Sequence, residues 1–292
     1  MNEHDVKKLK SYWGDKERAD AYFSVIEKRL SRLAFKERTL LEVGCGKGYS
    51  TCVYAASGAK KVLGLEIDGE RLSEGRKYLR EIPALNERVN FVQGTSDQIP
   101  AGTKTIGGVI MNEALSHYGK PEESLNEAHR VLKPGGQLFI FDDNNQLDIR
   151  GIFRRRFKRW PPYREKYDKI RREYFEEAFP DLPKKKYESL VRLTRGTTLK
   201  ELEKKQLHEL LDGDVTSEHS APRHPEIGSY AEREINPLNL KGKLENIGFD
   251  AELVPSYFSV NTNTERMLET FFQWTFPLSL LVSPGFSIIA TK

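Results

Sequence analysis

The sequence predicts an α/β fold with a doubly wound, seven-stranded and mostly parallel sheet. Short apolar runs alternate with helical stretches along most of the chain, and the runs are continuously apolar. Strands that helices cover on both faces have this pattern. The predicted strands are 40–43, 62–67, 89–92, 106–111, 137–141, 251–260 and 286–290.

This pattern divides the chain into four segments. Residues 1–38 form an N-terminal helical cap, because their apolar and aromatic positions follow a helix-like spacing. Residues 39–143 form a core with the first five strands, and 144–235 form a helical insertion, or lid, after the fifth strand. Within this lid, 165–179 and 184–211 are predicted helices. Residues 236–292 supply a C-terminal helix and strands that complete the core.

The composition indicates a globular protein without a membrane-spanning segment. Hydrophobic residues make up 38% of the 292 residues and charged residues 31%, so the chain can bury a core. The charged first ten residues lack the apolar stretch of a secretory signal, and we expect a cytoplasmic protein. Cys45 and Cys52 form no C-x-x-C pair, and we expect neither a metal site nor a disulfide.

The most informative segment is 40–50, in which an apolar strand runs into three alternating glycines and then into a helix. Glycines permit tight turns and the close approach of a ligand to the backbone, and a helix start offers unpaired N–H groups. Dinucleotide-binding enzymes use a related loop. However, Glu42 stands two residues before the first glycine. A carboxylate there would repel a pyrophosphate, and it favours a cationic ligand such as a sulfonium.

This segment resembles the E-x-G-x-G-x-G loop of class I S-adenosylmethionine-dependent methyltransferases, specifically the type 11 methyltransferase domain with its Rossmann-like fold. The resemblance implies S-adenosylmethionine as the cofactor. It places the methionine end of the cofactor against Glu42, Gly44, Gly46 and Gly48. A second acidic residue at the end of the second strand binds the ribose hydroxyls in this family, and the run 63–68 supplies Glu66 there, with Ile67 packing on the adenine.

The match continues after the third and fourth strands with one departure. The family often places Asp directly after the glycine at the end of the third strand, where this chain has Thr95. Thr95, Ser96 or Asp97 are therefore the candidates for the adenine contact. Asn112 after the fourth strand, and the run 130–136, again resemble the family.

A methyl acceptor that carries a proton requires a base, and four residues are candidates. His117 follows the fourth strand, on the edge that faces the cofactor, although a role in positioning the next helix is an equal alternative. His219, His224 and Tyr230 lie in a polar loop of the lid that could close over the site. Surface histidines without a catalytic role are the alternative for that loop.

Two further groups are candidates for contacting the substrate. Tyr12 and Trp13 could cap the cofactor or substrate, or pack only in the core. From Arg150 to Arg172 there are eleven Arg and Lys against two acidic residues, and Arg154 and Arg155 are the candidates within this run. It could hold an anionic substrate, lie on an anionic membrane surface, bind RNA, or be a solvated helix face.

The sequence therefore predicts an S-adenosylmethionine-dependent methyltransferase acting on a small-molecule, glycan or lipid-linked acceptor. Methylation of an oxygen is the family's commonest outcome, and the basic run favours an anionic substrate. The alternatives are an RNA methyltransferase and a non-catalytic binding protein with the same fold. DNA is not expected as a substrate, because Glu113 follows Asn112 and breaks the N-P-P-Y pattern of base methylation. The basic run also allows peripheral contact with the inner membrane face.

Overall fold

The computed structural model describes residues 2–33, 35–144, 146–149, 162–194, 197–203, 224–226, 235–256 and 275–292. The chain divides into two compact units. The sheet unit comprises Met1–Leu115, Lys120–Asp148 and Ile235–Lys292, and the helical unit comprises Ser116–Gly119 and Ile149–Glu234.

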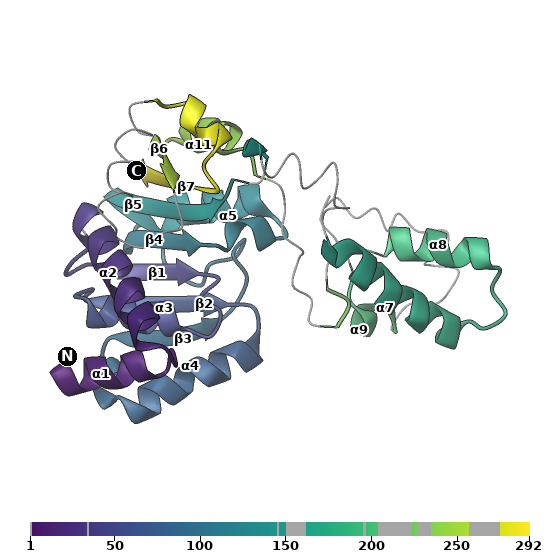
Figure 1. Cartoon of the computed structure of the whole chain (residues 1–292), viewed down its shortest axis with the longest axis horizontal. Coiled ribbons are helices and arrows are strands. Elements are labelled where there is room, and N and C mark those ends of the chain that lie inside the picture. The colour runs from purple at the N-terminus through teal and green to yellow at the C-terminus, as the bar shows by residue number, and fades with distance from the viewer. Residues whose placement is uncertain are drawn as a thin grey trace. The chain divides into compact units, whose positions relative to one another are not determined.

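The sheet unit contains a seven-stranded sheet in the order β3-β2-β1-β4-β5-β7-β6 (Figure 1). Neighbours among the first five strands pair in parallel, and β7 pairs antiparallel with β5 and with β6. The predicted seven-stranded, mostly parallel α/β sheet is therefore confirmed. Its strands are β1 (Thr39–Val43), β2 (Lys61–Glu66), β3 (Val89–Gln93), β4 (Ile106–Asn112), β5 (Leu132–Asp143), β6 (Asp250–Ser256) and β7 (Gly285–Thr291).

The first four strands agree with the sequence prediction to within one residue at each end. The fifth strand does not, because β5 begins at Leu132 instead of residue 137. The register between β4 and β5 shifts between Ile106 and Gly108, where Leu132 and Gln137 are their partners. Gly135 in the intervening run has a φ of 70°. The run 133–136 is thus a bulge at the start of the strand.

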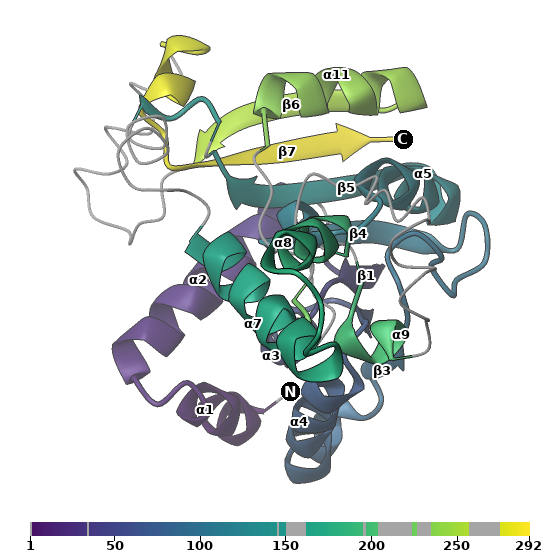
Figure 2. The same cartoon turned by 90° about the vertical axis from the view of Figure 1, so that its right-hand side faces the viewer.

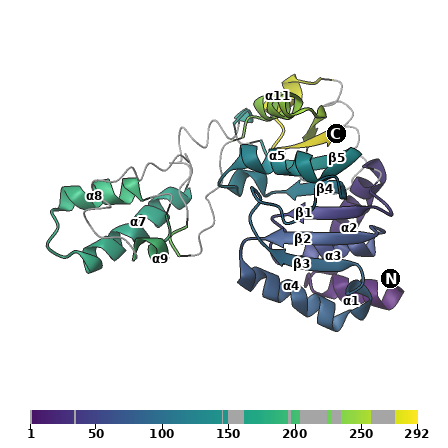
Figure 3. The same cartoon turned by 180° about the vertical axis from the view of Figure 1, so that it is seen from behind.

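Helices cover both faces of the sheet. On one face α2 and α3 pack against each other, and α1 and α4 extend this layer (Figure 1). On the other face lie α5 and α11 (Figure 3), and α11 runs beside β6 (Figure 2). Asp15 and Asp68 each cap a helix start by accepting backbone N–H groups. The helices are α1 (Glu3–Ser11), α2 (Lys16–Arg32), α3 (Tyr49–Ala56), α4 (Gly69–Glu81), α5 (Pro121–Val131) and α11 (Pro237–Ile247).

The helical unit is described by α7 (Pro162–Ala178), α8 (Lys184–Leu193) and α9 (Leu199–Leu202). These helices enclose their own apolar cluster of Phe175, Tyr187, Leu190, Val191 and Leu202. The prediction of one helix over 184–211 is wrong, since α8 ends at Leu193 and a capping box at Thr198 starts α9. None of the helices in the described ranges is both long and apolar enough to cross a membrane.

One aromatic side chain fixes how closely β3 approaches the glycine-rich turn after β1. A Cβ added to Gly48 would lie 2.3 Å from the Phe91 ring, and one added to Gly64 would lie 2.8 Å from it. Phe91 is only 6% exposed, so the ring fills the space that these glycines leave. Gly48 also has a φ of 73°, a conformation that L side chains rarely adopt.

We expect Gly48→Ala to lower the free energy of unfolding by about 3 kcal/mol or more, because the left-handed backbone and the contact with Phe91 both oppose a methyl group. Urea unfolding followed by circular dichroism measures this loss. Gly135→Ala is the matched control, since Gly135 has a φ of 70° but no atom within 4 Å of its added Cβ. It should lose only about 1–2 kcal/mol, the cost of the backbone conformation alone. Equal losses in the two variants would contradict the role assigned to Phe91.

Candidate functional site

The strand order places a topological switch point between β1 and β4. The chain moves from β1 outward to β2 and β3, and then returns to add β4 and β5 on the other side. In sheets of this kind, ligands bind in the crevice at the carboxyl ends of the strands beside the switch point. The loop from Gly44 to Gly48 follows β1, and Asn112 ends β4. Most of the cofactor residues predicted from the sequence therefore lie at one edge of the sheet.

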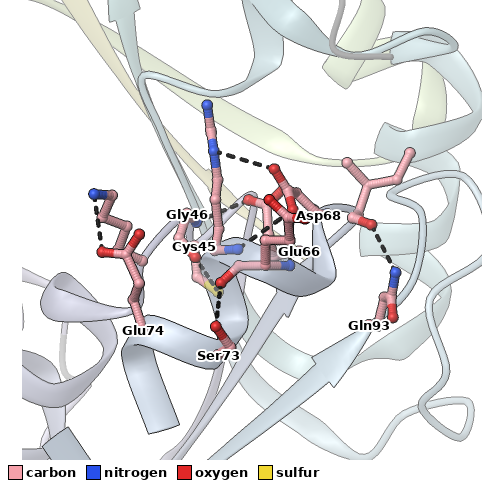
Figure 4. A network of polar contacts seen from close by, with 11 residues as sticks. Cys45, Gly46, Glu66, Asp68, Ser73, Glu74 and Gln93 are labelled. Carbon is pink, nitrogen blue, oxygen red and sulfur yellow. Dashed lines mark hydrogen bonds and ion pairs between the residues drawn. The ribbon is translucent and has the colours of Figure 1, made fainter. Parts of the chain in front are cut away.

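Glu66 joins this loop to the end of β2. One oxygen of its carboxylate accepts the Gly46 N–H at 2.8 Å, and the other accepts the Asp68 N–H at 3.1 Å (Figure 4). The side chain is only 7% exposed. The two backbone donors hold both oxygens at the strand end, in an orientation from which they can accept hydrogen bonds from two adjacent hydroxyl groups.

The loop backbone is open toward a ligand at its middle glycine. Gly44, Gly46 and Gly48 all have positive φ values, between 56° and 74°. A Cβ added to Gly46 would meet no atom within 4 Å, in contrast to Gly48, which faces Phe91. The Gly44 and Cys45 N–H groups both donate to the Leu65 carbonyl, at 2.8 and 3.0 Å. The start of the loop is thus hydrogen-bonded to β2, while Gly46 faces open space.

Glu42 lies beneath the loop, at 2% exposure. Its carboxylate accepts the Thr51 hydroxyl at 2.5 Å and a hydrogen bond from Ser50, which ties β1 to the first turn of α3. Burial raises the pKa of Glu42 to about 7, and the hydrogen bonds from Ser50 and Thr51 and the charge of Arg29 oppose this rise. Direct contact of Glu42 with a ligand stays a prediction.

The residues predicted for the adenine end gather after β2 and β3. Ile67 is 47% exposed, and its carbonyl accepts the Gln93 side-chain amide at 3.1 Å (Figure 4). Thr95 hydrogen-bonds to the Asp97 carboxylate, which helps to hold the pKa of Asp97 below its usual value although burial opposes this. The Ser96 hydroxyl accepts that of Ser124 at 2.7 Å. These contacts shape the loop after β3 beside the exposed Ile67 side chain.

Tyr12 and Trp13 belong to an aromatic cluster that reaches the glycine loop. The Trp13 ring lies 4.7 Å from Tyr22 and 4.9 Å from Tyr49, the first residue of α3. Tyr12 lies 4.9 Å from Tyr78 on α4. The cluster therefore packs the N-terminal helices against the helix that starts at the loop, and Trp13 keeps 39% of its surface exposed.

Arg29 of α2 was not among the residues predicted from the sequence. Its guanidinium lies 5.1 Å from the Phe139 ring centroid and 5.0 Å from that of Phe141, and its Nη1 donates to Asn112 Oδ1 at 2.5 Å. An arginine in an amphipathic helix carries no signal of these contacts, because Asn112, Phe139 and Phe141 lie more than 80 residues away in the sequence.

The comparison with known protein families agrees with this geometry. Residues 41–140, which run from β1 to β5, match a family model described as a methyltransferase domain. Residues 41–140 therefore form a methyltransferase domain. The cofactor of such domains is S-adenosylmethionine, and Glu42, Glu66 and Asn112 all fall inside the matched range.

Curated relatives match the same part of the chain. A demethylmenaquinone methyltransferase of Symbiobacterium thermophilum is 31% identical over 105 residues, which are 35% of this chain and 41% of that protein. The O-methyltransferase rstn1 of Aspergillus nomiae is 26% identical over 137 residues, 45% of this chain and 60% of that protein. The chain thus spans less than two thirds of the length of either relative.

A solved structure shares the fold of this chain. One chain of the complex between the Haloferax volcanii Trm112 methyltransferase activator and a methyltransferase has a TM-score of 0.50 at 15% identity. The match covers 98% of this chain and 96% of that one.

The two described candidates for the catalytic base, His117 and His224, belong to the helical unit. His117 is exposed in the short turn η2 (Leu115–His117) after β4, and the division of the chain places Ser116–Gly119 in the helical unit. His224, in the same unit, lies 4.8 Å from the Tyr167 ring, and burial lowers its pKa. His219, Tyr230, Arg154 and Arg155 lie outside the described residues. Among the described residues, no three His, Cys, Asp or Glu side chains form a metal-binding group.

We expect the stability of the wild-type protein to fall relative to that of the Glu42→Gln variant as the pH rises from about 4 to about 8. The folded state binds the Glu42 proton more tightly than the unfolded chain does, since burial raises the pKa from 4.5 to about 7. This stabilisation is complete below the unfolded pKa and is lost as the pH passes through the folded pKa. The difference should reach at most about 3 kcal/mol.

Thermal unfolding of both proteins across this pH range measures the effect. If the stability difference between the two proteins stays constant, or if the wild type becomes more stable relative to the variant as the pH rises, Glu42 is ionised in the folded protein. The Glu70→Gln variant is the control, because Glu70 is exposed on α4.

Proposed function

We propose that this protein transfers a methyl group from S-adenosylmethionine to an oxygen of a small-molecule, glycan or lipid-linked acceptor. The observation that carries the proposal is the Glu66 carboxylate, held by the N–H groups of Gly46 and Asp68 at the end of β2. Its position beside an open Gly46 and an exposed Ile67 suits a ligand that presents a ribose between an amino-acid arm and an adenine.

The residues present fit this cofactor. Glu66 offers two oxygens to the two ribose hydroxyls, and the free side of Gly46 accommodates a chain that passes close to the backbone. Ile67 provides an apolar surface for the adenine ring, and the loop after β3 presents Thr95 and Ser96 next to it. When bound, S-adenosylmethionine supplies an electrophilic methyl group on a sulfonium.

The protein's own contribution is to position the two reactants and to exclude water. Transfer of a methyl group is an in-line displacement, and holding the acceptor in line with the methyl group provides most of the rate enhancement. An acceptor hydroxyl must also lose a proton, for which His117 and His224 are the described candidates. The Tyr12 and Trp13 rings offer apolar contacts near the loop for either reactant.

The positive charge of one segment of the chain supports an anionic acceptor. The run Arg150–Arg172 carries eleven basic and two acidic residues. The structure describes this run from Pro162 onward, where α7 begins. Guanidinium groups bind carboxylates and phosphates through paired hydrogen bonds. One of the curated relatives named above is a demethylmenaquinone methyltransferase and the other is an O-methyltransferase. Both names are compatible with a small acceptor.

We expect calorimetric titration to show micromolar binding of S-adenosylmethionine and S-adenosylhomocysteine, and no binding of NAD. Glu66→Ala should weaken both by at least about 100-fold, because two hydrogen bonds to a charged group contribute about 3 kcal/mol or more. Glu70→Ala is the matched control, a carboxylate four residues later that is exposed to solvent. Circular dichroism should show that both variants are folded.

Three results would contradict the proposal: a wild type that binds neither S-adenosylmethionine nor S-adenosylhomocysteine, a wild type that binds NAD instead, or equal affinity of the Glu66→Ala and Glu70→Ala variants for the two ligands. If the binding result holds, incubation with radiolabelled S-adenosylmethionine and a panel of phosphorylated glycans and lipids should label an acceptor, and a neutral panel should not be labelled.

A further inference from the structure

A turn with exposed apolar side chains lies directly before β7. Eight large apolar side chains are exposed in the described part of the chain, and four of them belong to residues 276–282, the apolar turn: Phe276, Leu278, Leu281 and Val282. Single exposed apolar residues are common on proteins, but a contiguous group marks a surface that contacts a partner or a membrane. The sequence from 270 to 291 also contains no charged residue, in a chain with 31% charged residues.

Hydrogen bonds from the end of β5 hold the apolar turn in place. The buried Asn144 side chain donates to the Leu280 carbonyl at 2.5 Å and to the Ser283 carbonyl at 3.0 Å. The Asn144 backbone N–H donates to the Pro284 carbonyl at 2.9 Å. The Leu280 side chain is buried, whereas that of Leu278 is 69% exposed. The exposed side chains are therefore carried by a backbone that is fixed to the sheet.

The apolar turn lies at the edge of the sheet that carries the candidate site. Asp143, the last residue of β5, pairs with Gly285, the first residue of β7. Because these two strands are antiparallel, β7 begins where β5 ends, at the carboxyl ends of the parallel strands (Figure 2). A surface that contacts the turn therefore faces the same edge as Gly46 and Glu66.

The chain places positive charge close to this edge in the sequence. A few residues after β5 ends, the run 150–172 begins, with eleven basic and two acidic residues. Anionic lipid head groups attract such basic segments. Because a lipid surface is extended, the run can contribute without a fixed position relative to the turn. Apolar side chains combined with basic residues bind anionic membranes peripherally, whereas an RNA partner requires cations on the contact surface itself.

We propose that the apolar turn inserts into the surface of an anionic lipid bilayer, with the basic run bound to the lipid head groups. Docking at this edge brings the candidate site next to the lipid, which favours the lipid-linked acceptor among the acceptor classes proposed above. That consequence rests on the proposed function, and the docking itself does not.

Vesicle sedimentation tests the docking. The wild type should bind mixed phosphatidylglycerol and phosphatidylcholine vesicles at least about 10-fold more tightly than vesicles of phosphatidylcholine alone, and high salt should remove this preference. Leu278→Glu should weaken binding to the anionic vesicles by at least about 10-fold, because a charge replaces an apolar contact. Ala84→Glu is the matched control and should bind as the wild type does, since Ala84 is exposed in η1 (Pro83–Leu85) before β3, at the opposite edge of the sheet.

Insertion is measured separately with a fluorophore whose emission rises in apolar surroundings. Both native cysteines, Cys45 and Cys52, are buried, so Leu278→Cys and Ala84→Cys each add one accessible thiol for labelling. Anionic vesicles should raise and blue-shift the emission from position 278 and leave that from position 84 unchanged. Unchanged emission from position 278 would exclude insertion of the turn.

Other outcomes would also overturn the proposal. A wild type that does not bind anionic vesicles would refute the docking, and equal binding by Leu278→Glu would assign it to the basic run alone. Equal losses in Leu278→Glu and Ala84→Glu would reduce the effect to added charge. A dimer in analytical ultracentrifugation that Leu278→Glu dissociates would assign the turn to a second copy of the chain.

Calorimetric titration with S-adenosylmethionine separates this proposal from the proposed function. Leu278→Glu should bind the cofactor as the wild type does, because Leu278 lies outside the cofactor residues. A wild type that binds vesicles but no cofactor would refute the proposed function and leave the docking surface standing.

Discussion

The hydrogen bond from the Gly46 N–H to the Glu66 carboxylate joins the two loops on which the rest of the site depends. It fixes the turn after β1 against the end of β2, and the Asp68 N–H holds the other oxygen of the same carboxylate. Because the strands are parallel, both loops lie at one edge of the sheet. The fold thereby holds an acidic group, an open backbone and an apolar side chain, Ile67, next to one another before any ligand arrives.

Packing beneath this edge makes the arrangement rigid. The Phe91 ring occupies the space beside Gly48 and Gly64, and Glu42 is bonded to the first turn of α3. The glycines of the loop therefore serve different purposes, since Gly48 accommodates the core and Gly46 faces open space. One side of the loop is fixed by the sheet unit, and the other side stays accessible to a cofactor.

Local patterns in the sequence were enough to predict the sheet edge but not the contacts across it. The apolar runs and the glycine spacing predicted β1 to β4 to within one residue, and the same spacing led to Glu66, because these signals lie within a few residues of the feature. Arg29 could not be found in this way, since the aromatic rings and the amide that give it a role come from β4 and β5. The break between α8 and α9 was missed although Thr198 and Glu201 form a capping box there, a pattern that marks the start of a new helix. The acceptor has no comparable local signature in the sequence.

A crystal structure of the protein with S-adenosylhomocysteine would test the central claim most directly, namely that the cofactor binds across the carboxyl ends of β2, β1 and β4. The account predicts that the Glu66 carboxylate lies within hydrogen-bonding distance of both ribose hydroxyls, with the amino-acid arm over Gly46. A ligand bound away from this edge, or a ribose that does not contact Glu66, would contradict it.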